Sequence, residues 1–130
     1  MKLETMTPDP DWEVGECEEA VEILSRLSDG LTVKVWGGDW CPDCQNQLPG
    51  FAAALSAARI DPVADVEHYP VEKDDEGNKV GPKVEEYGVG FIPTVVIERE
   101  GEEVARFVEE EDVPIVVFLA RQLEELEASA

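Results

Sequence analysis

One succession of elements constrains the fold of this chain most: a strand, a glycine pair and then a helix that begins with cysteines. Residues 31–36 alternate and are rich in β-branched side chains, which indicates a strand. The pair Gly37-Gly38 ends it. The segment Trp40-Cys41-Pro42-Asp43-Cys44 then opens a helix that we expect to run through Ala58, with Pro49 kinking it. The sequence therefore predicts an α/β fold that holds two cysteines at the start of a helix.

The rest of the chain continues the alternation of helices and strands. Further helices are expected over residues 16–27, 82–87 and 112–127, and further strands within 63–71 and over 94–98 and 102–108. Helical connections favour parallel pairing, whereas the hairpin turn Arg99-Glu100-Gly101 favours an antiparallel final pair. The last helix has an apolar stripe made of Val116, Leu119, Leu123 and Leu126.

The length of the chain suits one domain over residues 1–130. Residues 1–13 are expected to be an irregular lead-in, and residues 74–83 a polar loop. The segment Ser28-Asp29-Gly30 is expected to end the first helix. We find no repeat or linker that divides the chain.

The charge of the chain excludes two classes of partner. Thirty-one acidic residues face ten basic ones, for a formal net charge of −21. Nucleic acids and anionic membrane surfaces both need positive charge on the protein, so neither is an expected partner. The like charge favours a monomer. It is interpreted either as a solubility device or as adaptation to the high-salt cytoplasm of a halophile, where the screening length falls to about 3 Å near 1 M.

The expected cellular compartment follows from the absence of a membrane span or signal region and from the number of cysteines. No apolar run reaches the roughly 18 residues of a membrane span, and Met1–Asp11 has no apolar signal region. The three cysteines, an odd number, do not form a secreted disulfide framework. We expect a cytoplasmic protein.

The spacing of Cys41 and Cys44 indicates redox chemistry. At a helix N-terminus the Cys41 sulfur faces unpaired N–H groups and the positive end of the helix dipole, a setting that favours the reactive thiolate. Pro42 suits the first helical turn. Cys44, one turn further in, lies on the same helix face and can resolve a mixed disulfide.

A zinc site is the alternative for these cysteines, and it needs two more ligands. Cys17 and His68 stand alone without ligand spacing, so no metal is expected. Cys17 is interpreted as a small buried or half-exposed residue rather than a regulatory thiol. His68 is interpreted as a surface or partner-facing residue without a role.

Several motifs together resemble the thioredoxin superfamily, over roughly residues 14–128. Trp40-Cys41-Pro42-Asp43-Cys44 is similar to the active site of thioredoxin-related proteins with a W-C-P-D-C motif. Pro49 matches the helix proline of the family, Ile92-Pro93-Thr94 its cis-proline loop, and Gly101 the glycine of its last hairpin. The resemblance implies a thioredoxin fold: a central mixed β-sheet with helices on both faces.

The resemblance also implies roles for residues. Cys41 and Cys44 are the catalytic pair, and no metal or organic cofactor is needed. Substrate contacts are implied for Trp40, Pro42, Asp43, Ile92, Pro93 and Thr94. Trp40 shields the thiolate and contacts the partner, the alternative being a core aromatic. From the residues alone the Ile92-Pro93 bond is expected to be trans, because cis bonds are a small minority; the resemblance implies cis.

Three positions depart from the family pattern. Val35 stands where a buried aspartate usually accepts the proton of the resolving thiol, which leaves Asp43, Asp39 or a water as candidates. Lys34 lies in a strand that should be buried, so we expect it to pair with an acid on a neighbouring strand or to reach outward. Glu109 stands where many thioredoxins have a glycine near the partner surface.

The sequence thus predicts a thiol–disulfide oxidoreductase, acting as a protein-disulfide reductase. Its partners are disulfide-containing proteins and an upstream reductase or small thiol. Two alternatives stay open: a dedicated electron donor to one client such as a peroxidase, and a redox-inert binding domain on the same fold.

Overall fold

A four-stranded mixed sheet forms the centre of the computed structural model, which describes residues 3–27, 30–109 and 111–129. Strand β1 pairs in parallel with β2 and antiparallel with β5, and β5 pairs antiparallel with β6. The expected mixture of parallel and antiparallel pairing is confirmed. Across the sheet the strands are β2 (Val66–Pro70), β1 (Leu31–Gly37), β5 (Thr94–Arg99) and β6 (Glu102–Val108).

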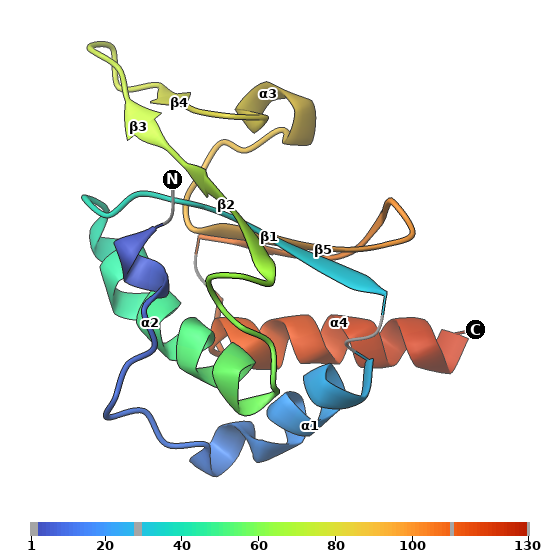
Figure 1. The fold of residues 1–130 in the computed structure, drawn as a ribbon. Coiled ribbons are helices and arrows are strands. Elements are labelled where there is room, and N and C mark those ends of the chain that lie inside the picture. Colours follow the sequence, from blue (N-terminus) through green and yellow to red (C-terminus); the bar gives the residue numbers. More distant parts are fainter. Residues whose placement is uncertain (1–2, 28–29, 110, 130) are drawn as a thin grey trace.

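Helices cover both faces of the sheet, but unequally (Figure 1). Three helices lie together on one face, and one short helix lies on the other. Helix α1 packs against α4 as well as α2, so it belongs to the same layer as both. This arrangement is the expected thioredoxin-like α/β fold. The three helices of the crowded face are α1 (Glu18–Leu27), α2 (Pro42–Ala57) and α4 (Ile115–Ser129), and the short one is α3 (Val84–Tyr87).

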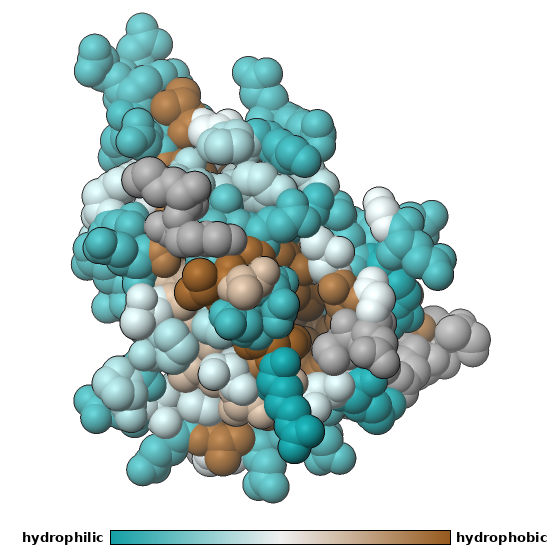
Figure 2. All heavy atoms as spheres, viewed as in Figure 1, coloured by the Kyte–Doolittle hydropathy of each residue, from teal (hydrophilic) through white to brown (hydrophobic). Residues whose placement is uncertain are grey.

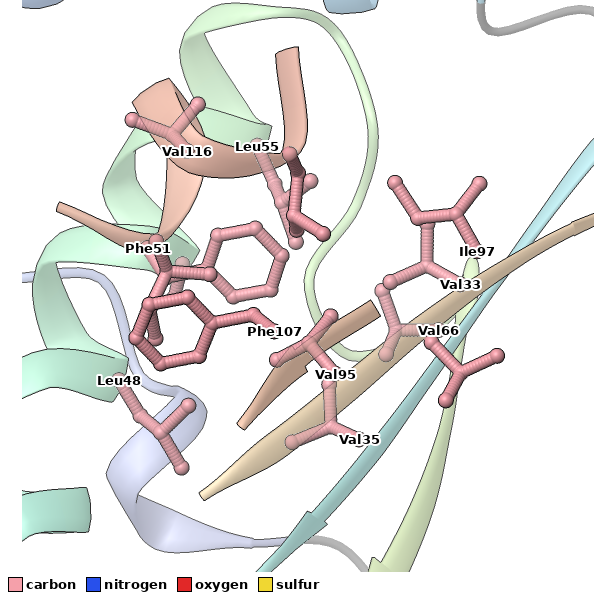
Figure 3. Packing of buried hydrophobic residues seen from close by; sticks show 14 of the residues in the cluster. Val33, Val35, Leu48, Phe51, Leu55, Val66, Val95, Ile97, Phe107 and Val116 are labelled. Carbon is pink, nitrogen blue, oxygen red and sulfur yellow. The ribbon is translucent and has the colours of Figure 1, made fainter. Parts of the chain in front are cut away.

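The main core lies between the sheet and the crowded helical layer (Figure 3). Alternate residues of β1, β5 and β6 point toward α2 and α4, because successive side chains of a strand face opposite sides. Phe51 and Leu55 of α2 meet this surface from the other side. The strand residues that meet them include Val33, Val35, Val95, Ile97 and Phe107, which are at most 3% exposed.

The opposite face of the sheet is closed by aromatic rings and one buried ion pair. Trp36 stacks on Tyr69 with ring centroids 4.7 Å apart and lies 4.8 Å from the ring of Tyr87. Beside them Lys34 Nζ lies 3.0 Å from a carboxylate oxygen of Glu98 and 2.9 Å from the Tyr87 hydroxyl. The expected pairing of Lys34 with an acid on a neighbouring strand is confirmed.

That ion pair changes the protonation behaviour of both partners. Burial raises the pKa of Glu98, but hydrogen bonds from Tyr87 and Lys34 outweigh it and leave that pKa below the usual value. Burial lowers the pKa of Lys34, yet its hydrogen bonds and nearby carboxylates leave it above the usual value. Both groups therefore stay charged at neutral pH.

Three expectations differ from the structure. The lead-in is not wholly irregular, since Glu4–Met6 form a 3-10 helix and Met6 is fully buried. The polar loop is partly a two-stranded ribbon, in which β3 (Glu72–Lys73) pairs antiparallel with β4 (Lys79–Val80). Leu126 leaves the apolar stripe of α4 and is 39% exposed, because the end of that helix extends past the core.

Other expected boundaries agree with the structure. The first helix, the second strand and the short third helix all lie inside their predicted ranges. In the hairpin between β5 and β6, Glu100 and Gly101 both have positive φ, as the tight turns that suit twisted strands require. Residues 28 and 29 lie outside the described residues. Among the described residues, no helix is long and apolar enough to cross a membrane.

We expect Glu98→Gln to lower the free energy of unfolding by about 3 kcal/mol, because it leaves the buried ammonium of Lys34 without a counter-charge. Urea unfolding at constant salt measures this. In the wild-type protein, the contribution of Glu98 is present above the unfolded glutamate pKa of about 4.3 and is lost as pH falls through the lower folded pKa.

The matched control is Glu103→Gln, which breaks the more exposed ion pair with Arg106. We expect it to cost less than about 1 kcal/mol. Equal losses for the two variants would show that the Lys34–Glu98 pair contributes no more than a surface pair.

Candidate active site

The two cysteines lie at the N-terminal end of α2, as the sequence predicts. Cys41 is the N-cap residue, with extended backbone angles (φ −86°, ψ 122°), and Pro42 occupies the first helical turn. Cys44 follows within the same turn. The two cysteines are not joined in a disulfide. Strand β1 ends at Gly37, and Gly38 to Trp40 connect it to Cys41.

Cys44 is fully buried, and Gly37 beside it leaves little room for a side chain. A Cβ on Gly37 would lie 3.1 Å from Leu48 Cδ1, 3.4 Å from Leu3 Cδ1 and 3.5 Å from Cys44 Sγ. The Gly38 N–H donates to Cys44 Sγ at 3.5 Å. The Cys44 thiol therefore lies near two leucine side chains and the backbone of the glycine pair.

This environment favours the protonated thiol. Burial is the main cause that raises the pKa of Cys44 to about 12, and the Gly38 N–H offsets it in part. Cys41 and the carboxylate of Asp43 raise the pKa further. Cys44 is therefore a protonated thiol at neutral pH.

Val35, at the position of the usual buried acid, is fully buried and brings no carboxylate to Cys44. The two candidate carboxylates, Asp39 and Asp43, differ in their hydrogen bonds and burial. Asp39 accepts the backbone N–H groups of Glu4 and Thr5, at 3.2 Å and 2.9 Å, so its carboxylate is occupied in holding the lead-in. Asp43 is half-buried on the first turn of α2.

The lead-in is part of the wall around Cys44. Leu3 is 4% exposed, and its N–H donates to His68 Nδ1 at 2.9 Å. His68 Nε2 lies 2.8 Å from the Pro62 carbonyl, so this nitrogen donates and the ring is the neutral Nε2–H tautomer. The interpretation of His68 as a surface residue without a role is wrong, because its ring joins β2 to the lead-in segment that holds Leu3.

The Ile92-Pro93-Thr94 loop lies against Cys41. The Cys41 thiol is 4.0 Å from the Ile92 carbonyl oxygen, within reach of a sulfur hydrogen bond. The Ile92-Pro93 bond is cis, so the expectation from the residues alone is wrong and that from the resemblance is confirmed. All three loop residues are buried, whereas the preceding Phe91 is 55% exposed.

Trp40 lies at the surface beside the cysteines, which rules out the alternative of a core aromatic. Its side chain is 44% exposed, and its Nε1–H donates to the Val71 carbonyl at 2.9 Å. Gly38 is required next to it, because a Cβ there would lie 2.5 Å from Trp40 Nε1. The Lys73 ammonium lies 5.7 Å from the centre of the indole ring.

Glu109 adopts the left-handed conformation that favours glycine (φ 54°), which agrees with its match to a family glycine. Its N–H donates to the Pro93 carbonyl at 2.7 Å, and its carbonyl accepts from the Gln47 side chain at 2.7 Å. These bonds tie the end of β6 to the Pro93 loop and to α2. Glu110, in the same acidic run, lies outside the described residues.

The remaining candidates lie away from this site. Cys17 is buried at the start of α1, as expected of a small core residue. Within residues 3–27, 30–109 and 111–129, no group of three or more His, Cys, Asp or Glu side chains is placed to hold a metal ion.

Comparisons with known proteins bear on the fold. No family model matches the chain, and no curated protein does. A protein of unknown function from Pseudomonas aeruginosa is similar in structure, with a TM-score of 0.55, 19% identity and coverage of 90% of this chain and 79% of that one. A mutant thioredoxin from Halobacterium salinarum shares 22% identity over 99% of this chain and 95% of its own, with a TM-score of 0.47.

Thioredoxin O2 from Arabidopsis thaliana shares 21% identity over 97% of this chain and 98% of its own, with a TM-score of 0.47. At such identities the likenesses concern the fold alone. What the cysteines do must be argued from the geometry of the site.

We expect the alkylation of Cys44 to be slow and to keep accelerating above pH 10, because burial holds its thiol protonated. The measurement is the rate of reaction with iodoacetamide in a Cys17→Ser/Cys41→Ser variant. Without Cys41, burial is the main remaining cause of the raised Cys44 pKa. An exposed cysteine would level off near its ordinary pKa of about 8.5.

The same variant in urea is the control and should level off near that ordinary value. Adding Leu3→Ala to the folded variant should shift the profile toward lower pH, since it opens one wall of the site to water. A folded profile that levels off below pH 9 would contradict the proposed effect of burial.

Proposed function

We propose that this protein is a thiol–disulfide oxidoreductase that reduces disulfides in other proteins. One observation carries the proposal: Cys41, which is 7% exposed, caps the N-terminus of α2, the fully buried Cys44 follows in the first turn, and the Ile92 carbonyl lies 4.0 Å from Cys41 Sγ. Two thiols so placed can exchange with a disulfide without a large movement of the backbone. The chemistry needs no metal or organic cofactor.

The reaction proceeds in two displacements at sulfur. The Cys41 thiolate attacks one sulfur of the substrate disulfide, which forms a mixed disulfide and releases the other substrate sulfur as a thiolate. Cys44 then loses its proton and attacks Cys41 Sγ, which releases the second substrate thiolate. The substrate gains two electrons and two protons, and the protein is left with a Cys41–Cys44 disulfide. An upstream reductase or a small thiol restores the dithiol.

The burial of Cys44 favours the reductive direction. A dithiol becomes a strong oxidant when its thiolate form is stabilised, because this stabilises the reduced state. Here burial does the opposite and raises the pKa of Cys44 to about 12. We therefore place the pair toward the reducing end of the span of about −270 to −120 mV that dithiol oxidoreductases cover.

Residues around the cysteines have proposed roles in substrate contact. Trp40 offers a half-exposed ring directly before Cys41, and the exposed Pro42 and half-buried Asp43 follow on the first turn of α2. The Ile92-Pro93-Thr94 loop holds the other side of the site. Thr94 fixes this loop, because its hydroxyl donates to the Phe91 carbonyl at 2.6 Å.

Cys41→Ser is expected to abolish the reduction of a peptide disulfide by dithiothreitol-reduced protein, whereas Cys44→Ser should accumulate a mixed disulfide through Cys41. The measurements are peptide-thiol release and the mass of the trapped adduct. Cys17→Ser is the control and should keep full activity, because Cys17 lies away from the site. Reduction that persists in Cys41→Ser would overturn the proposal.

The reduction potential separates the remaining interpretations. Thiol trapping across glutathione and dithiothreitol ratios should find the pair at the reducing end. A potential far outside the cytosolic range of roughly −220 to −320 mV would favour a redox-inert domain on this fold.

We also propose that the acidic surface is an adaptation to high salt. Repulsion within a net charge of −21 opposes folding when screening is weak. Dialysis from molar KCl into dilute buffer should therefore reduce the helical circular dichroism signal. Full retention of that signal would leave solubility as the simpler account of the charge.

A further inference from the structure

Two lysines lie directly opposite each other on the ribbon next to the cysteines. Lys73 of β3 and Lys79 of β4 are register partners in the antiparallel pair. Opposed residues of such a pair point to the same face of the ribbon, and like charges placed in this way repel. Because the chain has 31 acidic and ten basic side chains, a lysine would be expected to lie opposite an acidic residue rather than opposite another lysine. The two ammonium groups therefore lie on the same face of the ribbon.

This face of the ribbon borders the active site. Lys73 Nζ lies 5.7 Å from the centre of the Trp40 ring, and Trp40 directly precedes Cys41. The indole is itself tied to the start of the ribbon, because its N–H donates to the Val71 carbonyl. Lys73 is exposed and Lys79 half-buried, so both ammonium groups can reach a bound chain.

In the part of the chain that the structure describes, the acids of the ribbon, which are Glu72, Asp74, Asp75 and Glu76, form no ion pair with either lysine. Among the described residues, neither Lys73 nor Lys79 takes part in an ion pair. Glu72 is the register partner of Val80 and points to the other face. At the tip, Asp74 accepts the backbone N–H groups of Glu76 and Asn78 and thereby shapes the turn.

We propose that Lys73 and Lys79 form a docking site for an acidic segment of the disulfide-bearing client, beside the exposed ring of Trp40. This inference rests on the proposed function and narrows its substrate class. A net charge of −21 repels an acidic client, and the lysine pair gives that client one favourable place of contact next to Cys41. Figure 2 shows hydrophilic residues over most of the ribbon, which projects at the upper left.

The apolar part of the site fits the same client. Trp40 and Phe91 are 44% and 55% exposed, and they border the site from the cysteine loop and from the Ile92-Pro93 loop. The expected client segment thus has apolar residues close to its cysteine and carboxylates further along, toward the ribbon. A basic segment would be attracted to the acidic remainder of the surface but repelled by the two lysines.

The test compares two peptide disulfides that differ only in having glutamates or glutamines on both sides of the cysteine. Lys73→Gln/Lys79→Gln should lower kcat/KM for the acidic peptide about three- to tenfold, the range of two exposed charge pairs, and leave the neutral peptide unchanged. The loss should shrink in 1 M salt, where the screening length is about 3 Å.

The matched control is Arg59→Gln/Arg121→Gln. It removes the same charge from two exposed positions, after α2 and on α4, and should change neither rate by more than about twofold. An equal loss in the control, or an unchanged rate for the acidic peptide in the lysine variant, would overturn the docking site while leaving the proposed function intact.

A binding measurement separates failure of the docking site from failure of the redox function. The acidic peptide with serine in place of cysteine should shift the Trp40 indole N–H signal in NMR spectra, assigned with Trp40→Phe, and should shift it less in the lysine variant. Binding without reduction that depends on Cys41 would support the docking site and reject the proposed function. Absence of any shift in the wild-type protein would reject the docking site.

Discussion

The burial of one sulfur atom organises the active site. Cys44 is fully buried, and the space beside Gly37 is closed by Cys44 Sγ and by side-chain atoms of Leu48 and Leu3. Removing a thiol from water disfavours its charged form, so the packing that stabilises the fold also keeps Cys44 protonated. The hydrophobic core and the chemistry proposed for Cys44 therefore depend on the same packing.

The order of strands and helices could be predicted from the sequence because the signals are strong and local. Alternation in β1, the hairpin before β6 and the cysteine spacing each depend on a few adjacent residues. The pairing of Lys34 with Glu98 could also be anticipated, because a buried ammonium requires a counter-charge. For the Ile92-Pro93 bond, only the resemblance to a family pointed to the observed isomer.

The features that were missed depend on long-range contacts that leave little trace in a short window. The lead-in is mostly polar, and only Leu3 and Met6 reveal that it packs against the domain. His68 is 65 residues from Leu3 in the sequence, so the hydrogen bond that its ring accepts from the Leu3 N–H could not be predicted from the residues next to it. The ribbon strands contain two residues each, which is too short for an alternating pattern.

The attachment of the lead-in has a practical consequence for fusion proteins. The Leu3 N–H is hydrogen-bonded to His68 and its side chain lies near Gly37, so a tag or reporter joined directly upstream would crowd the two cysteines. The carboxyl end of α4 lies on the far side of the molecule from the start of α2 (Figure 1). Fluorescent partners, immobilisation handles and bait fusions for client capture are therefore better placed after α4, where they leave the entrance to the cysteines clear.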